Sequence, residues 1–332
     1  MAVHDMGACR WFFTPGPDEE STTLAILTPL THNLRDIIVS ALTGLFSHGP
    51  TPLANTLDYC GDPGLLGPDS VSWRVLGDAS VFIGGIRALV VQSAHAEVVA
   101  GVEDHSSYRT DPLGRLSRTS VYVTETTYGA MPEVEAAVQV VRTAHRPVTG
   151  TSERNLPYSA SRPEMAAWVH NVLTDSFLAA YQAFGPDRLS DLDADLFVAE
   201  QTRIGTLLGA DPLPETAAAL TDWINNHPDR VATKAQDSAI SFLRNPPLSL
   251  PIRIAYRQLF DAALTTIPPS IKDQLGVEPS RCARHIGNTA TGILRRALGA
   301  SPSWQLALVR CDSPIPAGLF RQPLPAQGAA NS

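Results

Sequence analysis

Four segments between Gly64 and Gly150 decide the fold of this chain. They read GLLGPDSVSWRVLGD (64–78), SVFIGGIRALVVQSAHAEVVAGV (80–102), DHSSYRTDPLGRLSRTSVYVTETTYG (104–129) and PEVEAAVQVVRTAHRPVTG (132–150). The second segment is apolar nearly all round, which predicts one central helix over residues 80–102. Its two glycines, Gly84 and Gly85, each cost about 1 kcal/mol relative to alanine in a helix. They serve either the close packing of two helices or a flat macrocycle that lies against the backbone.

The third segment is ambiguous between helix and strand. Residues 111–114 (DPLG) form a turn signal, and helical spacing resumes at Arg115. The threonines, valines and tyrosine that follow also favour a strand. We expect a helix here because the neighbouring segments are helical.

The fourth segment carries the sharpest pattern. Pro132 at a first-turn position begins a helix, and Pro147 and Gly150 end it. One face of this helix carries the series Val134, Val138, Val141 and His145.

The rest of the chain continues with amphipathic helices. Ser161 and Glu164 have the spacing of a capping box. Helical spacing predicts further helices at residues 30–46, 71–75, 163–184, 192–208, 214–226, 232–243, 252–264 and 279–298. The Pro-rich segment from Ser313 onward is expected to be disordered or loosely draped. No convincing alternating strand is present, so the predicted class is all-α, with many helices in a single domain.

Composition excludes several functions. The 332 residues carry a net charge of −8 and no Lys/Arg run, which argues against nucleic-acid binding. Neither a signal peptide nor a long uncharged apolar run is present, so we expect a cytoplasmic protein without a membrane anchor. The four cysteines form no CxxC and no CxxCH, which excludes covalent c-type haem attachment. Nucleotide, serine-hydrolase and zincin motifs are also absent.

Among the histidines, His145 is the strongest candidate for a ligand because it continues a buried valine stripe. A buried neutral imidazole needs a partner for each nitrogen, and iron plus one hydrogen bond would supply both. The alternative is a helix-end histidine that bonds to free carbonyls. His170 flanks an apolar helix face, and His95 in the apolar segment is more simply a satisfied core histidine.

Arg115, Arg118 and Thr119 share one face if their segment is helical. Guanidinium groups stay charged, so a partly buried pair needs anionic partners, and haem propionates are natural ones. The alternative is pairing with acids that are near in sequence, namely Glu103, Asp104, Asp111 or Glu125.

These motifs resemble a known family. The runs GGIRALVVQSAHAEVVAGVEDHS, DPLGRLSRT, VRTAHRPVTG, YSA and WVH, within about residues 64–209, are similar to the catalytic domain shared by latex-clearing proteins (rubber oxygenases) and the fungal mycophenolic-acid-pathway oxygenase. The resemblance implies a globin-like helical core that binds one non-covalent haem b. Along the chain we expect three parts: an N-terminal arm and first helix (1–60), a helical catalytic domain (61–300) and a Pro-rich C-terminal tail (301–332).

The resemblance also assigns roles to residues. The proximal iron ligand falls on His145, and an arginine and a threonine near the haem fall on Arg115 and Thr119. A lysine that can occupy the distal iron position in some latex-clearing proteins falls at Arg118, whose guanidinium cannot deprotonate to ligate iron. The sixth position is therefore expected to hold water or be open. The usual His-Pro pair reads His95-Ala96.

The combined prediction is a haem b-dependent oxygenase or other oxidoreductase. It would act on a small organic metabolite with dioxygen or peroxide. The predicted catalytic residues are Arg115, Arg118 and Thr119, and Arg87, His170 and Trp168 are further cofactor-pocket candidates. Glu97, Glu103 and Glu125 are the acids available to shuttle protons. Two alternatives remain open: a haem carrier or gas sensor without turnover, and a haem-free helical accessory protein.

Overall fold

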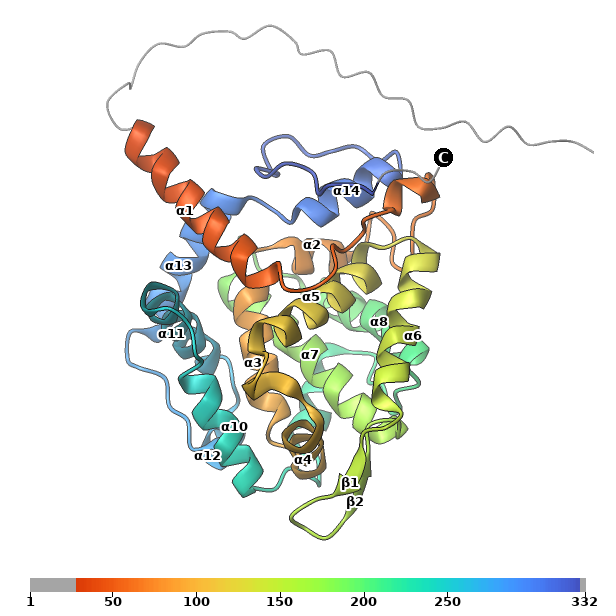
Figure 1. Ribbon diagram of the computed structural model, residues 1–332, viewed down its shortest axis with the longest axis vertical. Helices are drawn as coiled ribbons and strands as arrows, with labels where there is room; N and C mark the ends of the chain where they lie inside the picture. Colours follow the sequence, from red (N-terminus) through yellow and green to blue (C-terminus); the bar gives the residue numbers. More distant parts are fainter. Residues whose placement is uncertain (1–27, 329–332) are drawn as a thin grey trace, which may run out of the picture.

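Helices dominate the computed structural model, which describes residues 28–328 (Figure 1). The first half contains α1 (Thr28–Phe46), η1 (Thr56–Tyr59), α2 (Val71–Gly77), α3 (Val81–Gln92), α4 (Ala96–His105), η2 (Ser107–Arg109), α5 (Pro112–Tyr128) and α6 (Met131–His145). A short antiparallel hairpin, β1 (Thr149–Thr151) and β2 (Pro157–Ser159), leads to α7 (Pro163–Phe184) and α8 (Asp191–Leu208). The second half adds α9 (Ala217–Asn225), α10 (Lys234–Arg244), α11 (Leu250–Leu264), α12 (Pro269–Leu275), α13 (Ala283–Leu298) and α14 (Pro302–Arg310). The all-α class is therefore confirmed.

Helices α3 and α7 form the centre of the molecule and run antiparallel. Gly84 of α3 lies against Phe177, and at the other end the indole Nε1 of Trp168 donates to the carbonyl of Gln92 at 3.1 Å. A Cβ on Gly84 would stand 2.7 Å from the Phe177 ring and 3.1 Å from its Cα. Of the two roles considered for the glycine pair, the close packing of two helices therefore explains Gly84.

Gly85 has no such role in packing. A Cβ added there would meet no heavy atom within 4 Å, so the space in front of this glycine is open. The two adjacent glycines thus face different surroundings, and only Gly84 is required by contact with α7.

The prediction of one helix over residues 80–102 is wrong, because the chain breaks between Gln92 and Ala96. His95 adopts an extended conformation and its Nδ1 accepts from the amide of Val98 at 3.4 Å, which caps α4. The carbonyls freed by the break are bound by distant side chains: Trp168 binds that of Gln92, and Gln274 binds that of Ala94 at 2.8 Å. Tertiary contacts therefore replace the missing helical hydrogen bonds.

Two further local predictions are corrected at helix starts. Asp111 is the N-cap of α5, accepting from the amide of Gly114 at 2.9 Å, and Pro112 is its first residue, so the DPLG signal marks a helix start and not a turn. Residues 115–128 are helical, as expected. Helix α7 has the predicted bounds, but Arg162 is its N-cap and makes no side-chain capping bond, so the Ser161–Glu164 capping box does not form.

The C-terminal segment is more ordered than its composition suggests. Helix α14 was not predicted, yet Leu306 is fully buried and Arg310 is 1% exposed. Beyond it, Gln322 donates to the carbonyl of Leu298 and Gln327 to that of Leu53. The described part of the tail is thus docked on the helices. Helix α12 was also not predicted.

Within residues 28–328, no helix by itself combines the length and the apolar composition that a membrane span requires. Helices α2 and α3 reach them only together, as a pair bent by 91°.

Candidate functional site

Helices α5 and α6 are joined at Gly129 and Ala130 and diverge from that turn, with α3 and α7 behind them and α4 toward the lower end of the view (Figure 1). Arg115 precedes the turn by about as many residues as His145 follows it. Both residues therefore lie toward the open ends of the two helices.

His145 ends the inward face of α6. Val134 and Val138 of the same stripe are buried, and His145 is half-buried. Within the described part of the chain its imidazole makes no hydrogen bond, so bonding to free carbonyls at the helix end is not observed there. Burial lowers the pKa of His145 below its ordinary value of 6.5. A half-buried, neutral imidazole that makes no hydrogen bond to a described residue is chemically suited to ligate a metal.

Arg115 lines a small cavity at the start of α5. The cavity has a volume of about 30 Å³, room for about two water molecules. Its walls come from α3, α4, η2 and α10 and are mainly apolar: Leu89, Gln92, Ser93, Val98, Val99, Val102, Tyr108, Ala239 and Leu243. The guanidinium stands 5.8 Å from the centre of the Tyr108 ring. Arg115 is the only charged group that lines this cavity.

No described carboxylate pairs with Arg115, and its side chain donates no hydrogen bond to a described residue. Burial is the main cause that lowers the pKa of Arg115 below its ordinary value. Glu103, one of the acids expected nearby, is instead bound by Arg109 at 3.1 Å. A largely buried cation without a counter-ion leaves a place for an anionic group.

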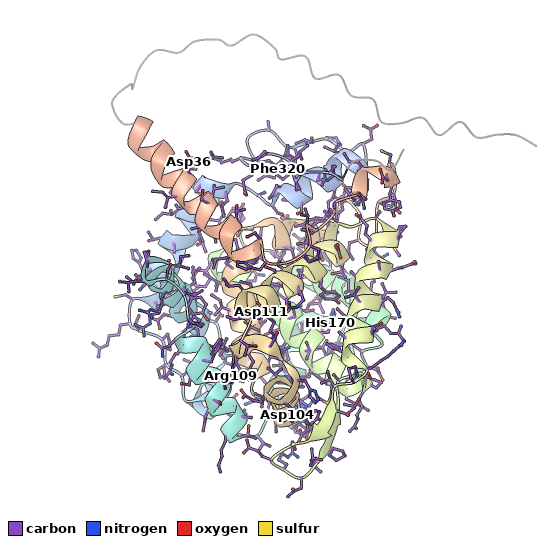
Figure 2. The ribbon with its side chains drawn as sticks, viewed as in Figure 1. Asp36, Asp104, Arg109, Asp111, His170 and Phe320 are labelled. Carbon is purple, nitrogen blue, oxygen red and sulfur yellow. The ribbon has the colours of Figure 1, made fainter. Side chains whose placement is uncertain are left out.

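Arg118 and Thr119, the other two predicted catalytic residues, are exposed. Arg118 pairs with Asp111 at 3.2 Å and also donates to Ser107, so it has found one of the acids near in sequence. Figure 2 labels Asp111 and Arg109, which lie just before the start of α5. The hydroxyl of Thr119 donates to the carbonyl of Arg115 at 3.0 Å.

The exposure of Thr119 is informative because of its neighbours on the helix. Arg115 and Tyr122 stand one turn to either side on the same face, and both are largely buried. The Tyr122 hydroxyl is buried without a hydrogen-bond partner among the described residues. On this face of α5, Thr119 is exposed to solvent. The Arg115 guanidinium and the Tyr122 hydroxyl on either side of it have no hydrogen-bond partner among the described residues.

Glu125 follows one turn after Tyr122. Burial, together with the nearby charge of Glu133, raises the pKa of Glu125 to about 7. Of the three acids proposed as proton shuttles, Glu97 and Glu103 are held by arginines, whereas Glu125 exchanges its proton near neutral pH. A carboxyl group with such a pKa is suited to general acid–base work.

The remaining predicted pocket residues are already engaged in the core. Arg87 pairs with Asp175 at 2.7 Å and is buried. His170, labelled on α7 in Figure 2, is buried with its Nε2 bonded to the carbonyl of Gln201 at 2.8 Å. Trp168 is fully buried on Gln92. All three side chains are thus held in the core by contacts with described residues.

A second polar cluster lies at the corner between α3 and α4. His95, His227 and Asp229 each offer one ligand atom, and these atoms lie within 4.8 Å of one another. Burial, followed by the nearby His227, lowers the pKa of His95 to about 4. No local pattern indicates this cluster, because His227 and Asp229 come from a loop 132 positions or more away from His95 and resemble solvated loop residues.

Comparison with known proteins agrees with this fold and with the motifs. A model of the family described as "ER-bound oxygenase mpaB/B'/Rubber oxygenase, catalytic domain" matches residues 73–299. The chain belongs to this family. The match extends from α2 to the end of α13 and includes Arg115, His145 and the His95 cluster. No curated protein and no solved structure matches the chain. Because the family is an oxygenase catalytic domain, membership supports an oxygenase activity.

Proposed function

We propose that the chain is a haem b-dependent oxygenase or related oxidoreductase, with His145 as proximal iron ligand and a small organic metabolite as substrate. Dioxygen or peroxide would be the co-substrate. The observation that carries the proposal is Arg115, a largely buried guanidinium that faces a cavity and has no described counter-ion.

The fit of a haem can be tested on the groups that the protein leaves unused. A haem offers an iron to one imidazole, propionates to cationic side chains and a flat face to a backbone without side chains. Among the described residues, the His145 imidazole and the Arg115 guanidinium have no hydrogen-bond or ion-pair partner, and no heavy atom lies within 4 Å of a Cβ built on Gly85. Each unused feature matches a different part of the group.

Two of these features are connected along one helix face. Gly85 and Leu89 are one turn apart on α3, and Leu89 lines the cavity of Arg115. The cavity has the size of a carboxylate group, so it suits a propionate and not the macrocycle itself. We therefore assign Arg115 to a propionate, Gly85 to the flat face and His145 to the iron.

Bound haem supplies the one-electron and dioxygen chemistry that protein side chains lack. The residues of this chain contribute position and protons. His145 fixes the group on α6, and Arg115 neutralises an anionic substituent beside α3 and α4. Glu125 holds a proton on its carboxyl oxygen and releases it near pH 7. The unsatisfied Tyr122 hydroxyl, one turn away, can donate or accept a hydrogen bond next to it.

Arg118 and Thr119 take part in the proposal as groups at the solvent edge of the same helix. Arg118 pairs with Asp111 and Thr119 donates to the carbonyl of Arg115, and these contacts keep both side chains at the solvent-exposed surface of α5. Arg87, His170 and Trp168 support the pocket from α3 and α7. We further propose that residues 61–300 are the catalytic domain, between an N-terminal part (1–60) whose first helix packs on the core and a Pro-rich C-terminal tail (301–332); residues 1–27 and 329–332 lie outside the described residues.

Titration of cofactor-free protein with haemin tests this assignment. Wild type should bind one equivalent and develop a Soret band, and His145→Ala should lose axial ligation and bind haemin much more weakly. His105→Ala is the matched control, because His105 is exposed and bonds only to the carbonyl of Thr149 among the described residues. Equal binding by His145→Ala and wild type, with an unshifted band, would move the ligand elsewhere.

Oxygen consumption separates the enzyme from a carrier or gas sensor. With haem bound and reductant present, candidate substrates of small size should raise the steady-state consumption of dioxygen. Haem binding without any substrate-dependent turnover would favour the carrier or sensor, and an absence of haem binding would favour the accessory protein.

A further inference from the structure

A second site can be built from the cluster of His95, His227 and Asp229. His95 lies at the N-terminus of α4 and is 4% exposed, whereas His227 and Asp229 are half-buried in the loop between α9 and α10. The His95 Nε2 stands 3.9 Å from Oδ2 of Asp229. The three ligand atoms together lie within 4.8 Å of one another.

The carboxylate of Asp229 is divided between two neighbours. Its Oδ1 pairs with Arg154 at 3.0 Å, and its Oδ2 faces His95. Arg154 also pairs with Glu97 at 3.3 Å. Two carboxylates therefore share one guanidinium beside the two imidazoles, and Arg230 adds a second positive charge near His227.

Glu97 has the position of an outer partner for a ligating histidine. Its Oε2 lies 3.5 Å from Nδ1 of His95, whereas Asp229 faces the other ring nitrogen, Nε2. The hydroxyl of Ser152 donates to Oε1 of Glu97 at 2.9 Å and holds the carboxylate in place. Ligating histidines commonly donate their second nitrogen to such a carboxylate, which frees the first nitrogen for the metal.

The Nδ1 atoms of both histidines accept long hydrogen bonds from backbone amides. Val98 donates to His95 at 3.4 Å, and Asp229 donates to His227 at 3.3 Å. For His95 the second tautomer, with the proton on Nδ1 toward Glu97, has its acceptor already in position. The change of tautomer that metal binding requires therefore exchanges the bond from the Val98 amide for one to Glu97.

Aromatic rings hold the two imidazoles in place. The Trp168 ring lies 5.3 Å from that of His95 and 4.8 Å from that of His227, and Trp223 lies 4.7 Å from His227. The half-buried loop side of the cluster faces solvent, so an ion can enter there and keep water or another ligand.

We propose that His95, His227 and Asp229 bind one divalent transition-metal ion, with Glu97 as the outer partner of His95. Two imidazoles and one carboxylate with open positions suit Zn²⁺ or Fe²⁺. Metal–ligand bonds of about 2.0–2.2 Å hold neighbouring ligand atoms about 3.4 Å apart. The 3.9 Å separation of His95 from Asp229 thus closes with a movement of about half an ångström. This site is separate from the proposed haem ligand and does not depend on it.

The test uses the full chain, treated with a chelator and then titrated with Zn²⁺ by calorimetry, with the bound metal counted by elemental analysis. Wild type should bind one equivalent. His227→Ala and Asp229→Asn should each weaken zinc binding at least about tenfold, and Glu97→Gln about 10- to 100-fold. Neither His227 nor Asp229 is in the buried core, so both variants are expected to keep the wild-type helical circular dichroism.

His285→Ala is the matched control, since His285 is exposed on α13 away from the cluster. It should bind zinc as wild type does, and so should His145→Ala, which separates this site from the haem ligand. The proposal is overturned if wild type shows no saturable zinc binding, if either cluster variant binds zinc with wild-type affinity, or if the His285 control loses binding equally.

Discussion

The adjacent glycines of α3 give a prediction in which one position is the control for the other. Gly84→Ala places a methyl group 2.7 Å from the Phe177 ring, 3.1 Å from its Cα and 3.2 Å from the carbonyl of Ser176. Two of these three atoms belong to the backbone of α7, which cannot move without separating the helices. Gly85→Ala places the same methyl group where nothing lies within 4 Å.

The magnitudes follow from two opposing effects. Alanine is favoured over glycine by about 1 kcal/mol in a helix interior, and this gain applies to both variants. Overpacking in a close-packed core costs about 1–3 kcal/mol and applies to Gly84→Ala alone. Gly84→Ala should therefore have a free energy of unfolding about 1–3 kcal/mol below that of Gly85→Ala, which itself should equal or exceed wild type by up to about 1 kcal/mol.

Denaturant unfolding of the cofactor-free proteins, followed by circular dichroism, measures this difference. The reasoning about α3 and α7 is refuted if Gly84→Ala proves as stable as Gly85→Ala. Haemin titration of the same two variants tests whether Gly85 contributes to haem binding. Gly85→Ala, although stably folded, should bind haemin more weakly than wild type, and unchanged binding would remove Gly85 from the haem face.

Three further predictions concern charged groups. The folded-state pKa of Glu125 is about 7 against an ordinary value of 4.5, so the protein should lose stability as pH rises from about 4.5 to 7. Glu125→Gln should remove that loss. The prediction is contradicted if the melting temperatures of wild type and Glu125→Gln change with pH in the same way across this range. Arg310→Met should lower the free energy of unfolding by about 3–5 kcal/mol, because the buried guanidinium donates to the carbonyls of Asp62 and Tyr128 beside Glu133. A loss below about 1 kcal/mol in denaturant unfolding would show that these contacts of α14 contribute little to stability. Arg118→Lys should leave the visible spectrum of the haem-loaded protein unchanged, since Asp111 holds this side chain at the surface, whereas a shift to a low-spin form would place residue 118 over the iron.

The sequence was a good guide where local pattern determines structure. The bounds of α7 and the inward face of α6 follow directly from apolar spacing. The family resemblance, carried by motifs such as VRTAHRPVTG, is confirmed by the match over residues 73–299.

The errors arose where distant contacts override local pattern. Nothing near His95 indicates that Trp168 and Gln274 will bind the carbonyls of a broken helix. The same holds for α14, whose burial depends on Arg310 reaching Asp62 and Tyr128. Composition marked this segment as a tail, and only tertiary contacts make it part of the core.

The site was predicted only in part for the same reason. Sequence spacing placed Arg115 and Arg118 on one helix and offered the same acids to both. In the structure Arg118 takes Asp111, Arg109 takes Glu103, and Arg115 remains without a described partner. Which arginine is left unpaired depends on side-chain competition across η2 and α5, and this competition has no signature in the spacing.

The central claim is that His145 holds a non-covalent haem b. The most direct measurement is the absorption spectrum of the purified protein supplied with haem, followed by acid–organic extraction and by the same spectrum for His145→Ala. We predict a Soret band from one haem per chain, full release of the chromophore on extraction, and loss of most of the band in His145→Ala with the helical content unchanged. A wild-type protein that acquires no Soret band, or a His145→Ala protein with the full wild-type spectrum, would contradict the claim.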